Sequence, residues 1–124
     1  MAHELILIVE DNPKNLKLVR DTLQVKGYQT VEAETGEEGV ALARERHPAL
    51  VLMDIQLPGI SGIEALRELR ADPVTRAIPV IAVTASVMAQ ERQKVMAAGF
   101  DGFQGKPISV RELLATVRGL PEKP

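Results

Sequence analysis

Cysteine and tryptophan are absent from this 124-residue sequence, which has only one tyrosine and two phenylalanines. Without cysteine the chain forms no disulfides and performs no thiolate chemistry, which fits a reducing compartment. So few aromatic side chains leave little surface to stack on a flavin ring. Redox functions that depend on thiols are thereby excluded, and those that depend on a flavin are disfavoured.

The sequence also lacks a large charge excess and a long hydrophobic run. Its formal net charge is −2, so it has no broad basic surface and nucleic-acid binding is not expected. The N-terminal apolar run Leu5–Val9 ends at Glu10 and Asp11, and is too short for a signal peptide or a membrane span. We expect a cytoplasmic protein that does not contact membranes, with one domain over residues 1–120 and a tail over 121–124.

Apolar segments that suit buried strands alternate with segments that carry helix-start signals. Asn12 followed by Pro13 is typical of a helix N-terminus. Capping boxes, in which Ser or Thr precedes Glu by three residues, recur at Thr35/Glu38, Ser61/Glu64 and Ser109/Glu112. The expected strands cover 5–9, 28–33, 50–53, 80–83 and 100–105, and the expected helices cover 13–27, 36–47, a segment from 62, 87–98 and a segment from 110.

This alternation predicts one α/β domain, in which a parallel sheet has helices on both faces. Nearly continuous apolar strands agree with a sheet that is covered on both sides. Ligands of such sheets bind beyond the carboxyl ends of the strands. Polar residues follow four of the expected strands at that edge: Glu10 and Asp11, Asp54, Thr84, and Lys106.

Three carboxylates at one edge repel one another unless a cation lies among them. Oxygen ligands without His or Cys favour Mg²⁺. A lysine and a hydroxyl beside the metal, Lys106 and Thr84, suit an anionic ligand such as a phosphoryl group. Asp54 is then the candidate nucleophile, because its strand is expected to be central and the most buried. Glu10 and Asp11 are left to hold the metal.

Four segments together resemble one known family. The chain is similar to the receiver domains of bacterial two-component response regulators over essentially its whole length. The resemblance implies a flavodoxin-like (βα)5 fold, a doubly wound five-stranded parallel sheet with strand order 2-1-3-4-5. The matching segments are ILIVEDN, LVLMDIQLPGISG, IAVTA and FQGKPIS.

The resemblance also implies roles for single residues. Asp54 would accept a phosphoryl group from a histidine kinase, and Asp11 and Asp54 would bind Mg²⁺ directly. The main-chain carbonyl of Gln56 would be a further ligand, and Glu10 would act mainly through water.

Other implied roles concern the phosphoryl group itself. Thr84 and the Ala85 N–H would bind its oxygens, and Lys106 would pair with them. The Lys106–Pro107 bond is expected to be cis.

A receiver must convert phosphorylation into a change of its surface. Phe103 occupies the position of the aromatic residue that follows Thr84 inward in similar receivers, although it could instead be a plain core residue. Gln104 replaces a residue that is usually aliphatic, and Gly102 and Gly105 beside it predict a weak fifth strand.

A docking face for a kinase helical bundle is also expected. Its apolar members lie off the core stripe of the first helix, but exposed apolar residues are common without a partner. The face comprises Pro13, Asn15, Leu18, Val25 and Ile108.

The leading hypothesis is a stand-alone receiver, since the chain begins with Met and ends soon after its expected fifth helix. Its partners would be a histidine kinase or phosphotransfer protein and a downstream kinase-like or adaptor target, and it would be a monomer or a weak phosphorylation-dependent dimer. It would not be an enzyme beyond its own phosphoryl transfer and slow autodephosphorylation.

Alternatives remain open. A receiver excised from a hybrid histidine kinase would share these features. A flavodoxin-like carrier would need a phosphate-binding first loop where this chain has Glu10 and Asp11, and a small Mg²⁺ phosphatase would need a nucleophile directly after its first strand.

Overall fold

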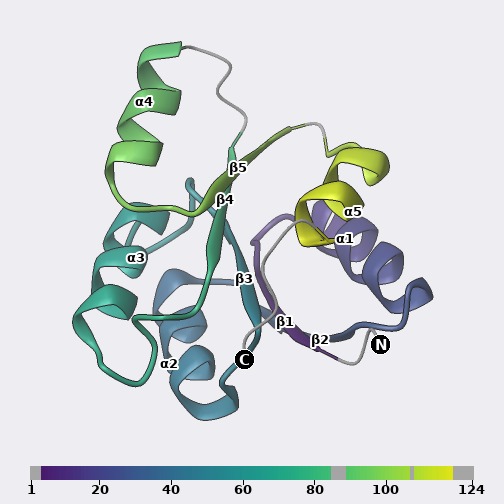
Figure 1. Ribbon diagram of the computed structural model, residues 1–124, viewed down its shortest axis with the longest axis horizontal. Helices are drawn as coiled ribbons and strands as arrows, with labels where there is room; N and C mark the ends of the chain where they lie inside the picture. Colours follow the sequence, from purple (N-terminus) through teal and green to yellow (C-terminus); the bar gives the residue numbers. More distant parts are fainter. Residues whose placement is uncertain (1–3, 85–88, 107, 119–124) are drawn as a thin grey trace.

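The computed structural model describes residues 4–84, 89–106 and 108–118. Strands and helices alternate along the whole chain (Figure 1). The strands are β1 (Leu5–Val9), β2 (Gln29–Ala33), β3 (Leu50–Asp54), β4 (Val80–Thr84) and β5 (Gly102–Gly105). The helices are α1 (Pro13–Val25), α2 (Gly36–Arg46), α3 (Gly62–Ala71), α4 (Ala89–Ala97) and α5 (Val110–Arg118).

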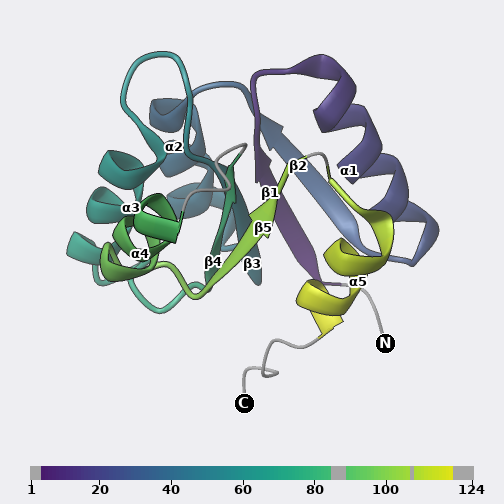
Figure 2. The ribbon, with the colours of Figure 1, turned by 90° about the horizontal axis from the view of Figure 1, so that it is seen from above.

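The predicted sheet is confirmed. Its five strands are parallel and lie in the order β2-β1-β3-β4-β5, which places β3 at the centre. Helices α2, α3 and α4 cover one face, and α1 and α5 cover the other (Figure 2). A right-handed crossover must lie between each pair of parallel strands, and the reversal of direction at β1 divides the helices between the faces.

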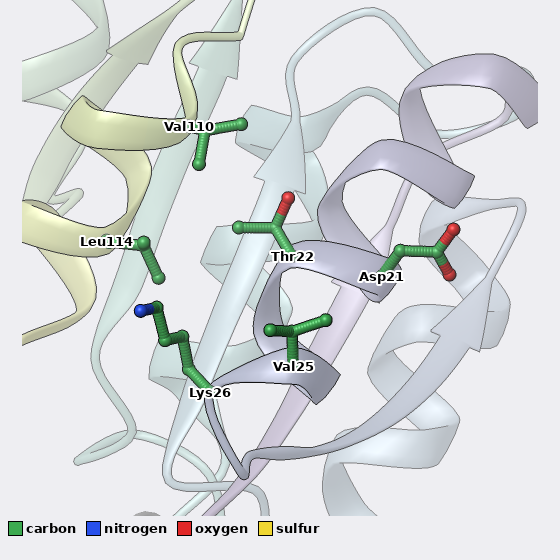
Figure 3. A pocket seen from close by; sticks show the side chains of 6 residues that line it. All are labelled: Asp21, Thr22, Val25, Lys26, Val110 and Leu114. Atoms are coloured by element: carbon green, nitrogen blue, oxygen red, sulfur yellow. The ribbon is translucent and has the colours of Figure 1, made fainter.

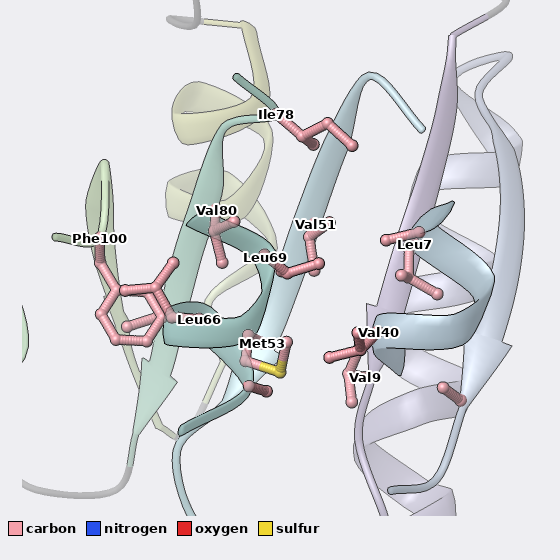
Figure 4. Close-up of a cluster of buried hydrophobic side chains, with 14 of the residues drawn as sticks. Leu7, Val9, Val40, Val51, Met53, Leu66, Leu69, Ile78, Val80 and Phe100 are labelled. Carbon is pink, nitrogen blue, oxygen red and sulfur yellow. The ribbon is translucent and has the colours of Figure 1, made fainter. Parts of the chain in front are cut away.

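Each face of the sheet buries its own apolar cluster. One contains Leu7, Val51 and Met53 from the strands with Leu66 and Leu69 from α3 (Figure 4). The other joins alternate residues of the same strands to α1 and α5: Ile6, Ile8, Leu52, Leu16, Val19, Leu23, Leu113 and Val117. Consecutive residues of a strand therefore serve opposite cores, which is why the strands are apolar almost throughout.

The helix-start signals are confirmed. The Asn12 side chain accepts hydrogen bonds from the N–H groups of Lys14 and Asn15. At the three capping boxes the hydroxyl accepts a hydrogen bond from the backbone N–H of the Glu residue. These local contacts fix where α1, α2, α3 and α5 begin.

Several predicted boundaries were wrong by one or two residues. Helix α1 ends at Val25, two residues before the expected end, although Gly27, with a φ of 92°, does stop the helix as the sequence indicated. Strand β3 includes Asp54, which pairs with Val83 of β4. Strand β5 starts at Gly102, where its pairing with Ile81 of β4 begins. The predicted start of the fourth helix, the Lys106–Pro107 bond and the domain boundary at 120 lie outside the described residues.

Candidate functional site

The carboxyl edge of the sheet gathers acidic residues from two neighbouring strands. Glu10 and Asp11 follow β1, and Asp54 ends β3 beside it. Each offers a carboxylate oxygen, and these three atoms lie within 4.8 Å of one another. Glu10 and Asp54 are only 3 % exposed, whereas Asp11 is exposed. The cluster is therefore open to solvent on the side of Asp11.

Asp54 is held on both sides of its carboxylate. The backbone N–H of Gln56 donates to Oδ1 at 3.0 Å, and the Lys106 ammonium donates to Oδ2 at 2.9 Å. The backbone of Asp54 is fixed as well, because α3 begins directly against it. A Cβ on Gly62 would collide with the Asp54 carbonyl oxygen, so only glycine permits this close approach.

Glu10 shares the lysine with Asp54. Its carboxylate lies 3.2 Å from the Lys106 ammonium and accepts a 3.1 Å hydrogen bond from the Asn12 N–H. Burial raises the pKa of Glu10 to about 7, aided by the hydrogen bond and the charge of Asp54 and opposed by Asn12 and Lys106. One proton is thus held readily within the acidic cluster near neutral pH.

Lys106 is brought to the acids by the fifth strand. Its backbone N–H donates to the Thr84 carbonyl at 2.8 Å, which extends the pairing of β4 with β5. Burial alone would lower the pKa of Lys106, but hydrogen bonds and charge interactions with Asp54 and Glu10 raise it overall. The lysine therefore stays charged in the site.

The remaining predicted ligands of the phosphoryl group and of the metal are placed in part. Thr84 ends β4 at the same edge and is 4 % exposed. Gln56 follows Asp54 and is exposed, so its main-chain carbonyl is a candidate ligand from the loop after β3. Ala85 lies outside the described residues.

Phe103 lies on the face of β5 opposite to α5. It is partly buried against the apolar cluster beneath α2 and α3. The guanidinium of Arg92, on α4, lies 4.9 Å from the centre of the Phe103 ring, a cation–π contact that joins α4 to β5. The sequence interpretation missed Arg92, because helical spacing alone does not show which strand residue an exposed arginine covers.

The predicted docking residues are only partly accessible. Leu18 is 38 % and Val25 82 % exposed. Pro13 is exposed and Asn15 half-buried, while Ile108 packs against the cluster beneath α1 and α5. A groove of about 310 Å³ between α1 and α5 shares only Val25 with this set (Figure 3), and it is lined by Asp21, Thr22, Val25, Lys26, Val110 and Leu114.

The acidic cluster suits magnesium. Its donors are oxygens, two of the carboxylates are buried, and the exposed Asp11 leaves room for water ligands. Mg²⁺ prefers oxygen ligands and keeps part of its hydration shell.

Among the described residues, no helix combines the length and apolar character needed to cross a membrane.

Comparison with known proteins identifies the class to which this fold and site correspond. The sequence model of the response regulator receiver domain matches residues 6–118, so the chain belongs to that family of two-component signalling domains. A phosphoacceptor role is general to the family. This membership favours the receiver interpretation over the flavodoxin-like carrier and the small phosphatase.

Within the family, the chain is similar to polar-differentiation response regulator DivK of Brucella ovis. The two are 45 % identical over 113 residues, which cover 91 % of this chain and 92 % of the relative.

Solved structures share the fold. The receiver domain of sensor histidine kinase PA1611 from Pseudomonas aeruginosa, which has a magnesium ion coordinated in its active site cleft, is 33 % identical with a TM-score of 0.87. The match covers 94 % of this chain and 96 % of that one. Chemotaxis response regulator CheY4 of Vibrio cholerae is 26 % identical with a TM-score of 0.88, over 94 % of this chain and 98 % of that one.

Proposed function

We propose that this protein is a DivK-like single-domain receiver that accepts a phosphoryl group on Asp54 from a phosphohistidine of a kinase or phosphotransfer protein. The supporting observation is the contact of Asp54 with Lys106 beside Glu10 and Asp11. Both Asp54 and Glu10 contact the lysine, but Asp54 alone among the three carboxylates ends the central strand.

The transfer exchanges one phosphorus bond for another. A carboxylate oxygen of Asp54 attacks the phosphorus, the P–N bond to the donor imidazole breaks, and the imidazole leaves with the bonding electron pair and is protonated by solvent. The product is an acyl phosphate on Asp54. Bound Mg²⁺ would supply positive charge to the phosphoryl oxygens.

The chain's own residues prepare this step. Gln56 N–H orients the Asp54 carboxylate, and the Lys106 ammonium, already at hydrogen-bond distance, neutralises charge as the phosphoryl group arrives. Glu10 and Asp11 would hold the metal, with the Gln56 carbonyl and Asp54 as further ligands. Thr84 and the Ala85 N–H would then bind the phosphoryl oxygens.

The signal would pass from the site to the surface. Movement of Thr84 toward the phosphoryl group would let Phe103 shift, and Arg92 on α4 would follow it. Partners would dock through Pro13, Asn15, Leu18, Val25 and Ile108. We further propose a cytoplasmic location and a role in polar differentiation or the cell cycle, in keeping with the relative's name.

The likeness to a receiver from a sensor histidine kinase supports a second architecture, in which this domain is part of a hybrid kinase. The single-domain form is favoured because the chain is 45 % identical to the DivK relative and 33 % identical to the histidine-kinase receiver. The length of the native open reading frame distinguishes the two.

Labelling tests the function directly. Radiolabelled acetyl phosphate and Mg²⁺ should give one acid-stable, base-labile label on the protein, and Asp54→Asn should abolish it. Asp21→Asn, which changes a half-exposed aspartate on α1, is the matched control and should label normally. Persistent label on Asp54→Asn would show that another residue is the acceptor.

A further inference from the structure

Strand β5 carries a buried polar side chain that the phosphoryl chemistry does not use. Gln104 is 2 % exposed. Its neighbour Phe103 packs on the α4 side, and since consecutive strand residues point to opposite faces, Gln104 lies on the side of α5. A buried carboxamide is costly unless it is hydrogen-bonded. The identity of its partner is therefore informative.

That partner is a carboxylate in the first turn of α5. The Gln104 Nε2 donates to Oε2 of Glu112 at 3.3 Å. Glu112 is itself anchored, because its backbone N–H donates to the Ser109 hydroxyl at the start of the helix. A hydrogen bond to a charged acceptor is stronger than one between neutral groups, so this contact ties β5 to α5.

The hydrogen bond between Gln104 and Glu112 spans the part of the chain that contains Lys106. Gln104 and Glu112 stand on either side of residues 105–111, and Lys106 lies within this segment. Among the described strands, β5 is at the edge of the sheet and pairs only with β4. It also begins and ends with glycine, which gives its backbone unusual freedom. The backbone bond from the Lys106 N–H to the Thr84 carbonyl holds this end of the strand to β4, and a contact with α5 would restrain it further.

We propose that Gln104 and Glu112 are a positioning pair for Lys106. Their hydrogen bond holds the connection between β5 and α5 so that the Lys106 ammonium stays within reach of Asp54. An aliphatic residue at 104 would fill the same space without joining strand to helix. This inference deepens the proposed phosphoacceptor function and rests on it.

The test separates positioning from metal binding and from folding. Gln104→Leu and Glu112→Ala should each slow labelling by acetyl phosphate about fivefold, the change expected from loss of one hydrogen bond. Their Mg²⁺ dissociation constants should stay within about twofold of wild type, because Lys106 is not a metal ligand. Glu112→Gln keeps an acceptor oxygen and should restore most of the rate.

A double-mutant cycle with Lys106→Ala supplies the decisive measurement. If the pair acts through Lys106, Gln104→Leu should not slow labelling further once the lysine is gone. Glu45→Ala, which removes an exposed acid on α2, is the matched control. Additive effects in the cycle, a wild-type rate for Gln104→Leu, or a loss of Mg²⁺ affinity parallel to the loss of rate would each overturn the proposal. Failure of the wild type to label would instead refute the phosphoacceptor function itself.

Discussion

Lys106 contacts both buried carboxylates of the site and lowers the pKa of Glu10, although burial has the larger, opposite effect. Its ammonium lies 2.9 Å from Asp54 and 3.2 Å from Glu10. In the absence of metal it is the cation that offsets the repulsion between these two acids. If Glu10, Asp11 and Asp54 held a divalent ion, part of that task would pass to the ion, and the lysine would be available for phosphoryl oxygens.

Replacing the lysine should therefore separate the two roles. We expect Lys106→Ala to lower the melting temperature of the metal-free protein and to bind Mg²⁺ at least as tightly as wild type, since a competing cation is removed. Labelling by acetyl phosphate should fall by about tenfold or more, because a charge-stabilising donor is lost. Thermal unfolding with and without Mg²⁺, together with labelling rates, checks both parts. Lys14→Ala, at an exposed lysine of α1, serves as control, and normal labelling of Lys106→Ala would remove the assigned role.

The raised pKa of Glu10 leads us to expect an unusual dependence of folding stability on pH. Its pKa is about 7 in the folded protein and 4.5 ordinarily, so between these values the folded state binds more protons than the unfolded state. Stability from this group is thus fully present below about pH 4.5 and is lost as pH rises through 7, with a slope of at most about 1.4 kcal/mol per pH unit.

Urea unfolding in the presence of a chelator measures this slope. We expect Glu10→Gln, which mimics the protonated acid, to gain stability relative to wild type as the pH is raised from 5 to about 8. Added Mg²⁺ should remove most of the loss of wild-type stability at high pH, because the ion would stabilise the Glu10 carboxylate. A constant difference between the two proteins across this range would contradict the raised pKa of Glu10.

At the scale of elements, the two ends of the sheet are organised differently. The carboxyl end collects the acidic site, while the opposite end is closed by Arg70 of α3. Its guanidinium donates to the carbonyls of Ile78 and Gly99 and to the Asp101 carboxylate. The same Asp101 carboxylate accepts a hydrogen bond from the Val80 N–H. One side chain thus joins α3 to the starts of β4 and β5.

Removal of this side chain should loosen the edge strand without touching the site. Arg70→Ala should lower the free energy of unfolding by about 1–3 kcal/mol, since several charge-assisted hydrogen bonds are lost. Urea denaturation at neutral pH measures it, with Arg67→Ala, an exposed arginine of the same helix, as control. Equal losses for both variants would mean that the contacts of Arg70 contribute nothing specific.

What the sequence could predict differs between elements. Helix starts were accessible because Asn12, Thr35, Ser61 and Ser109 act locally, on the residues that follow them. The bonds of Gln104 with Glu112 and of Arg92 with Phe103 were not, because they depend on how a helix is rotated against a strand. The weak fifth strand that Gln104 suggested does form, though it is only four residues long.

At the scale of the whole molecule, the parallel topology does what no local pattern could. It brings Glu10 and Asp11 to Asp54 because β1 and β3 are neighbours in the sheet although α1, β2 and α2 separate them in the chain. The convergence of polar residues was predicted from the parallel topology alone, whereas the order of strands was available from the family resemblance. The burial of Glu10 and its shared lysine were not available, because both depend on side-chain packing.

Magnesium should stabilise the folded molecule as a whole. A ligand that binds only the native state adds about 2.7 kcal/mol when its concentration is 100 times its dissociation constant. We therefore expect the melting temperature to rise with Mg²⁺, and Asp11→Asn to weaken this response by removal of an exposed carboxylate ligand. Thermal unfolding over a series of Mg²⁺ concentrations tests it, with Asp21→Asn as control, and an unaltered response in Asp11→Asn would argue against the metal site.

The adjacency of β1 and β3 also affects the order in which the site forms during synthesis of the protein. A chain emerging from the ribosome presents Glu10 and Asp11 early, Asp54 midway and Lys106 almost last. Affinity for Mg²⁺ would therefore arise once β1 has paired with β3. Phosphorylation, which also needs Lys106, would require that β5 has joined the sheet.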